Sequence, residues 1–82
     1  MKNIIKGYLV NLSIEDINNH AIKYNINLSE DELIFTYNFI KNNYEEILDN
    51  PDSFNFSDYE AYYSKENFSK INQLIKKYYN YL

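Results

Sequence analysis

The chain has 82 residues, the length of one domain, and it carries a net charge of −4 with no cysteine and a single glycine, Gly7. The missing cysteines exclude disulfides, thiolate metal sites and cysteine nucleophiles, and the lone glycine excludes the glycine-rich phosphate loops. Because 45% of the residues are apolar but no run approaches the ~18 apolar residues of a membrane span, we expect one folded, cytoplasmic domain over residues 1–82 with no membrane contact.

The chain begins with two short amphipathic segments. Apolar spacing predicts one helix over residues 2–11 and a second helix over residues 14–24, each with a single apolar stripe. The first stripe is Ile4, Ile5, Tyr8, Leu9 and Leu12, and the second is Ile14, Ile17, Ala21 and Tyr24. Residues 25–28 then form a short linker.

The third predicted helix, residues 30–48, is the longest and has two apolar faces. One face is a narrow stripe made of Leu33, Tyr37, Ile40, Tyr44 and Ile47. Phe35 and Phe39 lie roughly opposite that stripe, four residues apart. A helix that is apolar on both sides is usually buried between neighbours, so we expect this long helix at the centre of the bundle.

The last third of the chain is expected to hold a short helix and a long one. Residues 49–53 break the chain, since Pro51 cannot continue a helix. A short helix at 58–63 and a final helix at 65–81 follow, the latter with the apolar residues Phe68, Ile71, Leu74, Ile75, Tyr78 and Leu82. No segment alternates like a strand. The predicted fold is all-α, a compact small bundle of four main helices plus one short helix.

One local pattern, a large apolar residue followed by serine and an acidic turn, marks the helix starts. The serines are Ser13, Ser29, Ser57 and, in a weaker copy, Ser64. Glu32 and Glu60 stand three residues after a serine, where a capping box places its carboxylate. The residue before serine is expected to pack on the residue five positions later, as in the pairs Leu12–Ile17, Leu28–Leu33 and Tyr63–Phe68.

Charge is distributed unevenly along the chain. Residues 1–28 carry three lysines against two acids, a net +1, and residues 61–82 carry four lysines against one acid, a net +3. Residues 29–60 carry one lysine against nine acids, a net −8. Such a middle repels nucleic acid and anionic membranes. The acidity of residues 29–60 is explained as that of a solvated surface whose acids cap helices. Alternatively, these acids imitate the row of phosphates along a nucleic acid.

No residue pattern supports enzyme chemistry. His20 is the only histidine and has no nucleophile motif beside it, so it is interpreted as structural or solvated. Counted from Asp49, Glu60 takes the twelfth position of a calcium loop, but Pro51 at the third and Phe54 at the sixth exclude an EF-hand. We therefore predict a non-enzymatic protein with no catalytic residues, metal, cofactor or small-molecule substrate.

Nucleic-acid binding is a weaker alternative. The helices at 14–24 and 30–48 with their short linker resemble SAP-like and helix-turn-helix pairs. However, the second helix opens with three acids, and the chain has no arginine for bidentate base or phosphate contacts. Lys70, Lys76 and Lys77 could contact phosphates, although the last two also fit as cations near a helix C-terminus.

Two segments, NLSIEDINNHAIKYNINLSEDE at 11–32 and YSKENFSKINQLIKKYYNYL at 63–82, carry a family resemblance. With their Asn-Leu-Ser helix start, the joint from Ala21 to Ser29 and the C-terminal Asn-Gln-Leu helix, they resemble short uncharacterised Firmicutes proteins of the YqfT type, a family with a domain-of-unknown-function label. The resemblance covers about half of the chain and does not include residues 44–62. It implies a small, helical, cytoplasmic bacterial protein and brings no functional residues.

The expected function is protein interaction. The chain has more large apolar side chains than one small bundle easily buries, and a contiguous exposed patch of them would mark an interface with another protein or a second copy. The candidate interaction patch is Phe35, Phe39, Phe54, Tyr59 and Tyr62. The alternative for these aromatics is a lid that closes the bundle. The alternative functions are an acidic mimic or inhibitor of a nucleic-acid-binding protein and weak nucleic-acid binding.

Overall fold

The computed structural model describes the backbone of residues 2–79 and the side chains of residues 6–50 and 52–77. Its elements, in chain order, are α1 (Lys2–Val10), α2 (Ile14–Lys23), α3 (Glu30–Asp49), the 3-10 helices η1 (Pro51–Ser53) and η2 (Phe56–Tyr62), and α4 (Lys65–Tyr79). The described part of the chain contains no strand. The all-α prediction is confirmed, and each of the four main helices begins within a residue of its predicted start.

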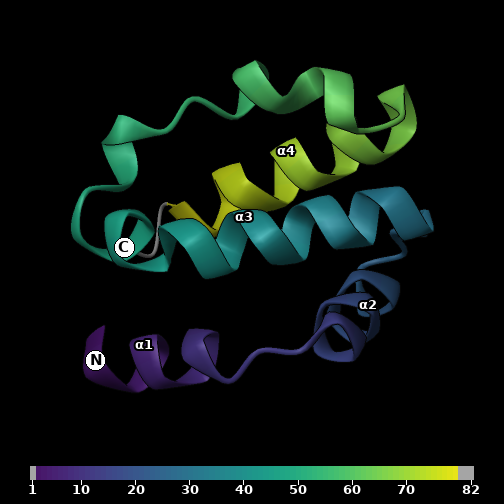
Figure 1. The fold of residues 1–82 in the computed structure, drawn as a ribbon. Coiled ribbons are helices and arrows are strands. Elements are labelled where there is room, and N and C mark those ends of the chain that lie inside the picture. Colours follow the sequence, from purple (N-terminus) through teal and green to yellow (C-terminus); the bar gives the residue numbers. More distant parts are fainter. Residues whose placement is uncertain (1, 80–82) are drawn as a thin grey trace.

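Helix α3 lies at the centre of the fold, as its two apolar faces predicted. In Figure 1, α1 and α2 lie on one side of α3, and α4 and η2 lie on the other. Helices α3 and α4 run in the same direction, so their N-termini lie at the same end of the molecule. The segment that contains η1 and η2 passes along the outside and returns the chain to that end.

The helix starts follow the predicted capping chemistry at Ser13 and Ser29. Each serine hydroxyl accepts the N–H of the third helical residue, and the carboxylate of that residue, Asp16 or Glu32, accepts the serine N–H. Asp16 completes a capping box that the sequence analysis did not assign, because aspartate reaches back as glutamate does. Ser64 also accepts an N–H, from Asn67 at 3.1 Å.

The prediction for Ser57 and Glu60 is wrong. The short helix predicted at 58–63 is present as the 3-10 helix Phe56–Tyr62, and it begins two residues earlier than a cap at Ser57 would place it. Its N-cap is Asn55, whose side-chain oxygen accepts the N–H of Ser57 at 3.2 Å and its hydroxyl at 2.8 Å. An asparagine side chain bonds the backbone two residues on more readily than serine does, and it therefore starts the turn earlier. Another 3-10 turn, η1, occupies the predicted chain break.

The buried apolar core of the described residues is thin. It consists of Leu12, Ile17, Ala21 and Ile26, all from the α1–α2 region and the linker before α3. Several residues of the predicted stripes remain exposed instead, namely Tyr8, Ile14, Tyr24 and Ile75. Helices at the edge of so small a bundle have one neighbour on which to pack, so the margins of their stripes stay in water. Four further stripe members, Ile4, Ile5, Tyr78 and Leu82, lie outside the described side chains.

None of the helices in the described range combines the length and apolar character that a membrane span needs.

Candidate functional site

The five residues of the candidate interaction patch lie together in one aromatic cluster. Phe39 meets the ring of Phe54 edge-on at a centroid distance of 5.5 Å and that of Tyr59 at 4.8 Å. Phe35 stacks on Tyr62 at 4.1 Å with the two rings 8° from parallel. Two residues of α3 thus contact three residues of the η1–η2 segment. We call this cluster the aromatic lid, and its members are Phe35, Phe39, Phe54, Tyr59 and Tyr62.

Within the aromatic lid, the rings cover one another more than they face water. Four of the five residues are half-buried, and only Tyr62 is exposed, with 55% of its surface in water. Tyr62 lies over Phe35, so one ring face is stacked and the rest is accessible. The lid therefore closes this side of α3, as the alternative interpretation expected, and Tyr62 forms its outer surface.

The candidate interaction patch did not include two aromatics that anchor the lid, Phe56 and Tyr63. Phe56 stacks on Phe68 of α4 at 4.8 Å with the rings 3° from parallel. The Tyr63 hydroxyl lies 2.6 Å from the Thr36 hydroxyl, which itself donates to the Glu32 carbonyl oxygen at 2.7 Å. Because that donation uses the only hydroxyl proton of Thr36, Tyr63 is the donor to Thr36. Burial raises the pKa of the Tyr63 hydroxyl.

A buried carboxylate joins the starts of α3 and α4. Glu32 is only 6% exposed, and it accepts the backbone N–H of Ser29 at 2.7 Å and that of Ser64 at 2.8 Å. The buried amide of Asn67 donates to the same carboxylate at 2.8 Å and to the Asn27 carbonyl at 2.9 Å. We call this group the Glu32 node. The spacing of Glu32 predicted a cap for α3, but the second helix end that it caps lies 32 residues away.

The hydrogen bonds of the Glu32 node decide the charge of its carboxyl group. Burial by itself pushes the pKa of Glu32 up, but the hydrogen bonds from Ser29, Ser64 and Asn67 outweigh it and hold the pKa below the ordinary value of 4.5. The side chain is therefore an anion at neutral pH, placed at two positive helix N-termini. Its donors are two backbone N–H groups and the Asn67 amide, so the node joins the starts of α3 and α4.

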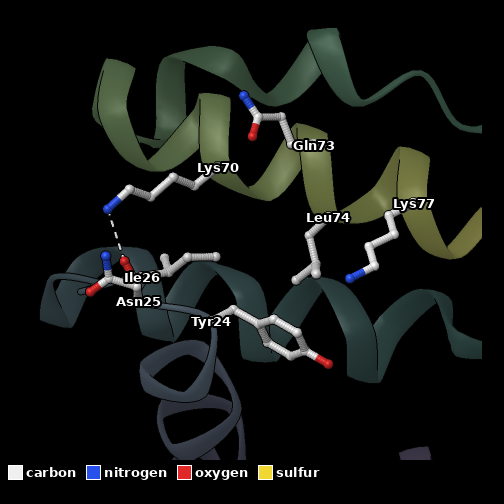
Figure 2. Close-up of a pocket in the computed structure, with 7 residues that line it drawn as sticks. All are labelled: Tyr24, Asn25, Ile26, Lys70, Gln73, Leu74 and Lys77. Atoms are coloured by element: carbon white, nitrogen blue, oxygen red, sulfur yellow. Dashed lines mark hydrogen bonds between the residues drawn. The ribbon is translucent and has the colours of Figure 1, made fainter.

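A shallow groove of about 230 Å³ lies between α4 and the linker that follows α2 (Figure 2). Tyr24, Ile26 and Leu74 contribute apolar surface, and Lys70 and Lys77 reach over it from α4. Lys70 connects α4 to the linker after α2, since its ammonium donates to the Asn25 carbonyl at 2.8 Å. The same ammonium lies 3.6 Å from the carboxylate of Glu66. No carboxylate, histidine or serine occurs among the described residues that line this groove.

A wider groove of about 670 Å³ runs between the η1–η2 segment and α4. Phe54 and Phe56 of the lid segment form one wall, and Ile75, Asn72 and Lys76 of α4 form the other. The groove shows that the lid segment does not seal completely against α4. It also places Phe54, one of the predicted patch residues, at the edge of an open apolar surface.

His20 has a structural partner. Its ring Nε2 is hydrogen-bonded to the Tyr8 hydroxyl, and the two rings meet nearly edge-on with centroids 5.9 Å apart. The pair links α1 to α2 at the surface. Within the described residues, no three histidine or acidic side chains gather as metal ligands would.

Comparisons of the chain with family models, curated proteins and solved structures found no match. The resemblance to the YqfT-type family therefore stays a prediction.

Proposed function

We propose that this protein is a non-enzymatic helical module that acts by binding another protein or a second copy of itself. The observation that carries the proposal is the imbalance between buried and exposed apolar surface. Of the described residues, four apolar side chains are buried, whereas eight large ones keep roughly two-fifths or more of their surface in water. Where such exposed apolar side chains are contiguous, they are characteristic of interaction surfaces.

Tyr62 marks the part of the aromatic lid that is available to a partner. Exposed tyrosines supply large contact area at a low cost in conformational entropy, and they are enriched at binding hot spots. The predicted patch would therefore act through the outer surface of Tyr62, with Phe35, Phe39, Phe54 and Tyr59 as the scaffold that holds it.

Analytical ultracentrifugation, together with affinity capture from the native cell and mass spectrometry, tests the proposal. We expect either concentration-dependent self-association or a specific captured protein. A strictly monomeric chain that captures nothing would remove the proposal. For the lid, Tyr62→Ala is expected to reduce capture of that protein by about tenfold or more, whereas Ala61→Ser, at the neighbouring exposed position, should leave it unchanged.

A second candidate function, an acidic mimic or inhibitor of a nucleic-acid-binding protein, is favoured by the end of α3. Glu45, Glu46 and Asp49 occupy its last turns. The final turn contains no basic residue, and of the three acids Glu45 lies 3.8 Å from the ammonium of Lys6 in α1. Acids at the negative end of a helix dipole cost stability, about 0.3–1 kcal/mol each. These three acids are exposed at the C-terminal end of α3, where a negative charge is unfavourable, and this suggests a role other than capping.

Neutralising these acids tests the mimic. The triple variant Glu45→Gln, Glu46→Gln, Asp49→Asn is expected to weaken partner binding and its dependence on salt. Partner binding that is unchanged in this variant, and insensitive to salt in the parent, would eliminate the mimic. Weak nucleic-acid binding stays a separate hypothesis, and a gel-shift assay that shows no shift at low salt would end it.

A further inference from the structure

The η1–η2 segment, residues 51–62, is attached to the long helices through aromatic rings rather than through hydrogen bonds. It leaves the end of α3, passes along the outside of that helix and returns the chain to the start of α4 (Figure 1). The hydrogen bonds described for residues 53–62 all stay within residues 50–63, such as those from Ser53 to Asn50 and from Ser57 to Asn55. Among the described residues, none of these bonds reaches α3 or α4.

Four rings seat the η1–η2 segment, and these are Phe54, Phe56, Tyr59 and Tyr62. Their partners are Phe35 and Phe39 of α3 and Phe68 of α4. No described side chain of the segment is fully buried, and the groove of about 670 Å³ beside α4 shows that the packing is incomplete. A segment with few buried apolar contacts opens locally at a lower free energy than the core.

Both ends of the η1–η2 segment are held by hydrogen bonds that do not depend on its rings. At the downstream end, the N–H of Ser64 donates to the Glu32 carboxylate at 2.8 Å. At the upstream end, the N–H of Asn50 donates to the Glu46 carbonyl at 2.8 Å. The rings can therefore separate from α3 and α4 while the two ends stay in place.

The η1–η2 segment is longer than the path that it has to cover. The bond between Ser64 and Glu32 places its downstream end at the first turn of α3. The path from there to Asp49 is about 26 Å, since seventeen residues of helix rise about 1.5 Å each. Residues 50–63 reach about 45 Å when extended. Unwinding the two 3-10 helices therefore gives the segment enough length to lift its rings without moving either long helix.

We propose that the η1–η2 segment is a strap that opens as one unit while α3, α4 and the Glu32 node stay folded. In the open form the four rings leave their partners, and Phe35 and Phe39, which are half-buried in the closed form, face water together on one side of α3. Opening thus converts a covered aromatic surface into an exposed one. This inference does not rest on the proposed interaction function, because it concerns the single unbound chain.

Native-state hydrogen exchange, measured by NMR at low urea concentrations, tests the opening in the wild-type chain. The N–H of Asp58, bonded to the Asn55 carbonyl, is expected to exchange about tenfold or more faster than the amides at the centre of α3. Its rate should also depend less on urea, because opening exposes little surface. The N–H of Ser64 is the internal control and should exchange with the long helices. Equal rates and equal urea dependence at Asp58 and in α3 would overturn the inference.

Tyr59→Ala tests whether the η1–η2 segment opens as a unit. Loss of this ring is expected to accelerate exchange throughout η2 by about tenfold or more and to leave Ser64 and α3 unchanged, because the ring stabilises only the closed form. Binding of the apolar dye 1-anilinonaphthalene-8-sulfonate should rise as Phe35 and Phe39 are uncovered. The control is Ile22→Ala on α2, where the wild-type side chain is 55% exposed, and it should change neither measurement.

Circular dichroism confirms that both variants keep the helical fold. Acceleration that is uniform over the whole chain would show that the η1–η2 segment unfolds only together with α3 and α4, and it would overturn the inference. Acceleration limited to the amides next to position 59, or dye binding no higher than in Ile22→Ala, would also contradict a strap that opens as one unit. The exchange pattern of the wild-type chain decides the question if Tyr59→Ala does not fold.

Discussion

At the scale of single residues, Glu32 has the largest structural role. Two parallel helices bring two positive N-termini to one end of the molecule, and these ends repel each other unless an anion lies between them. Glu32 supplies that anion from within α3 and bonds the first N–H of both caps, Ser29 and Ser64. One carboxylate therefore stabilises the parallel arrangement of α3 and α4 that Figure 1 shows.

Glu32→Gln is expected to destabilise the fold by about 2–4 kcal/mol at pH 7, because the buried charge-assisted hydrogen bonds are lost and an amide faces donors. The pKa of Glu32 is lowered on folding, so its contribution is present above about pH 4.5 and is lost as the pH falls through the folded value. The variant should therefore lose less stability than the wild type between pH 5 and pH 2. Urea unfolding followed by circular dichroism measures both effects.

Glu60→Gln is the control for this prediction, since the exposed Glu60 makes no capping box in the structure. It should change stability by less than about 0.5 kcal/mol. Some acid dependence is expected to persist in Glu32→Gln, because hydrogen bonds from the Ser13 backbone and hydroxyl lower the pKa of Asp16. An unchanged acid transition in Glu32→Gln would contradict the role assigned to the node.

At the scale of elements, the joint between α2 and α3 shows how local chemistry sets the path of the chain. Helix α2 ends in a Schellman motif, with the N–H of Ile26 bonded to the Ala21 carbonyl at 2.8 Å and that of Asn25 to the Ile22 carbonyl at 2.9 Å. Asn25 adopts a left-handed conformation, with φ of 63°. This turn directs Ile26 into the core, and Lys70 of α4 then binds the Asn25 carbonyl.

Asn25→Ala is expected to cost about 1 kcal/mol of stability, because a residue with a β-carbon and no local hydrogen-bonding group is strained in the left-handed region. Asn25→Gly should match or exceed the wild type, since glycine adopts that conformation freely. Asn27→Ala, two residues on in the same linker, serves as the control. Thermal unfolding distinguishes the three variants, and equal losses for Asn25→Ala and Asn25→Gly would argue against the backbone explanation.

At the scale of the whole molecule, α3 separates two packing zones of different chemistry. An aliphatic zone around Leu12, Ile17, Ala21 and Ile26 lies towards α1 and α2, and the aromatic lid lies on another side. Helix α1 is attached through polar contacts as well as through the buried Leu12, which follows its last residue. The ammonium of Lys41 on α3 donates to the carbonyls of Leu9 and Val10 at the end of α1, and Lys6 lies 3.8 Å from Glu45.

Lys41→Met is expected to loosen α1 selectively, because the variant keeps the aliphatic stem but leaves the last carbonyls of α1 without their cation. Hydrogen exchange measured by NMR should accelerate in α1 by about tenfold, equivalent to about 1.4 kcal/mol, with little change at the centre of α3. Lys65→Met, at an exposed position, is the control. Uniform acceleration throughout the chain would show that α1 does not open independently.

The helices were predictable from the sequence because their signals are local. Apolar spacing located the four main helices, and the caps at Ser13 and Ser29 followed from residues three apart. The error at Ser57 has a local cause too, since Asn55 competes for the same turn. The candidate patch was predicted as a set of residues, but whether its rings face a partner or each other depends on how the η1–η2 segment folds over α3.

The sequence by itself determined the fold class, the positions of the helices and the central place of α3, since each depends on hydrophobic period and capping within a few residues. Only the tertiary structure decided that Glu32 is shared between two helices and that Tyr62 rather than Phe39 faces water. These features depend on which distant segments meet. The conformational entropy lost in bringing such segments together, and the contact energy gained, are not determined by any one stretch of the chain.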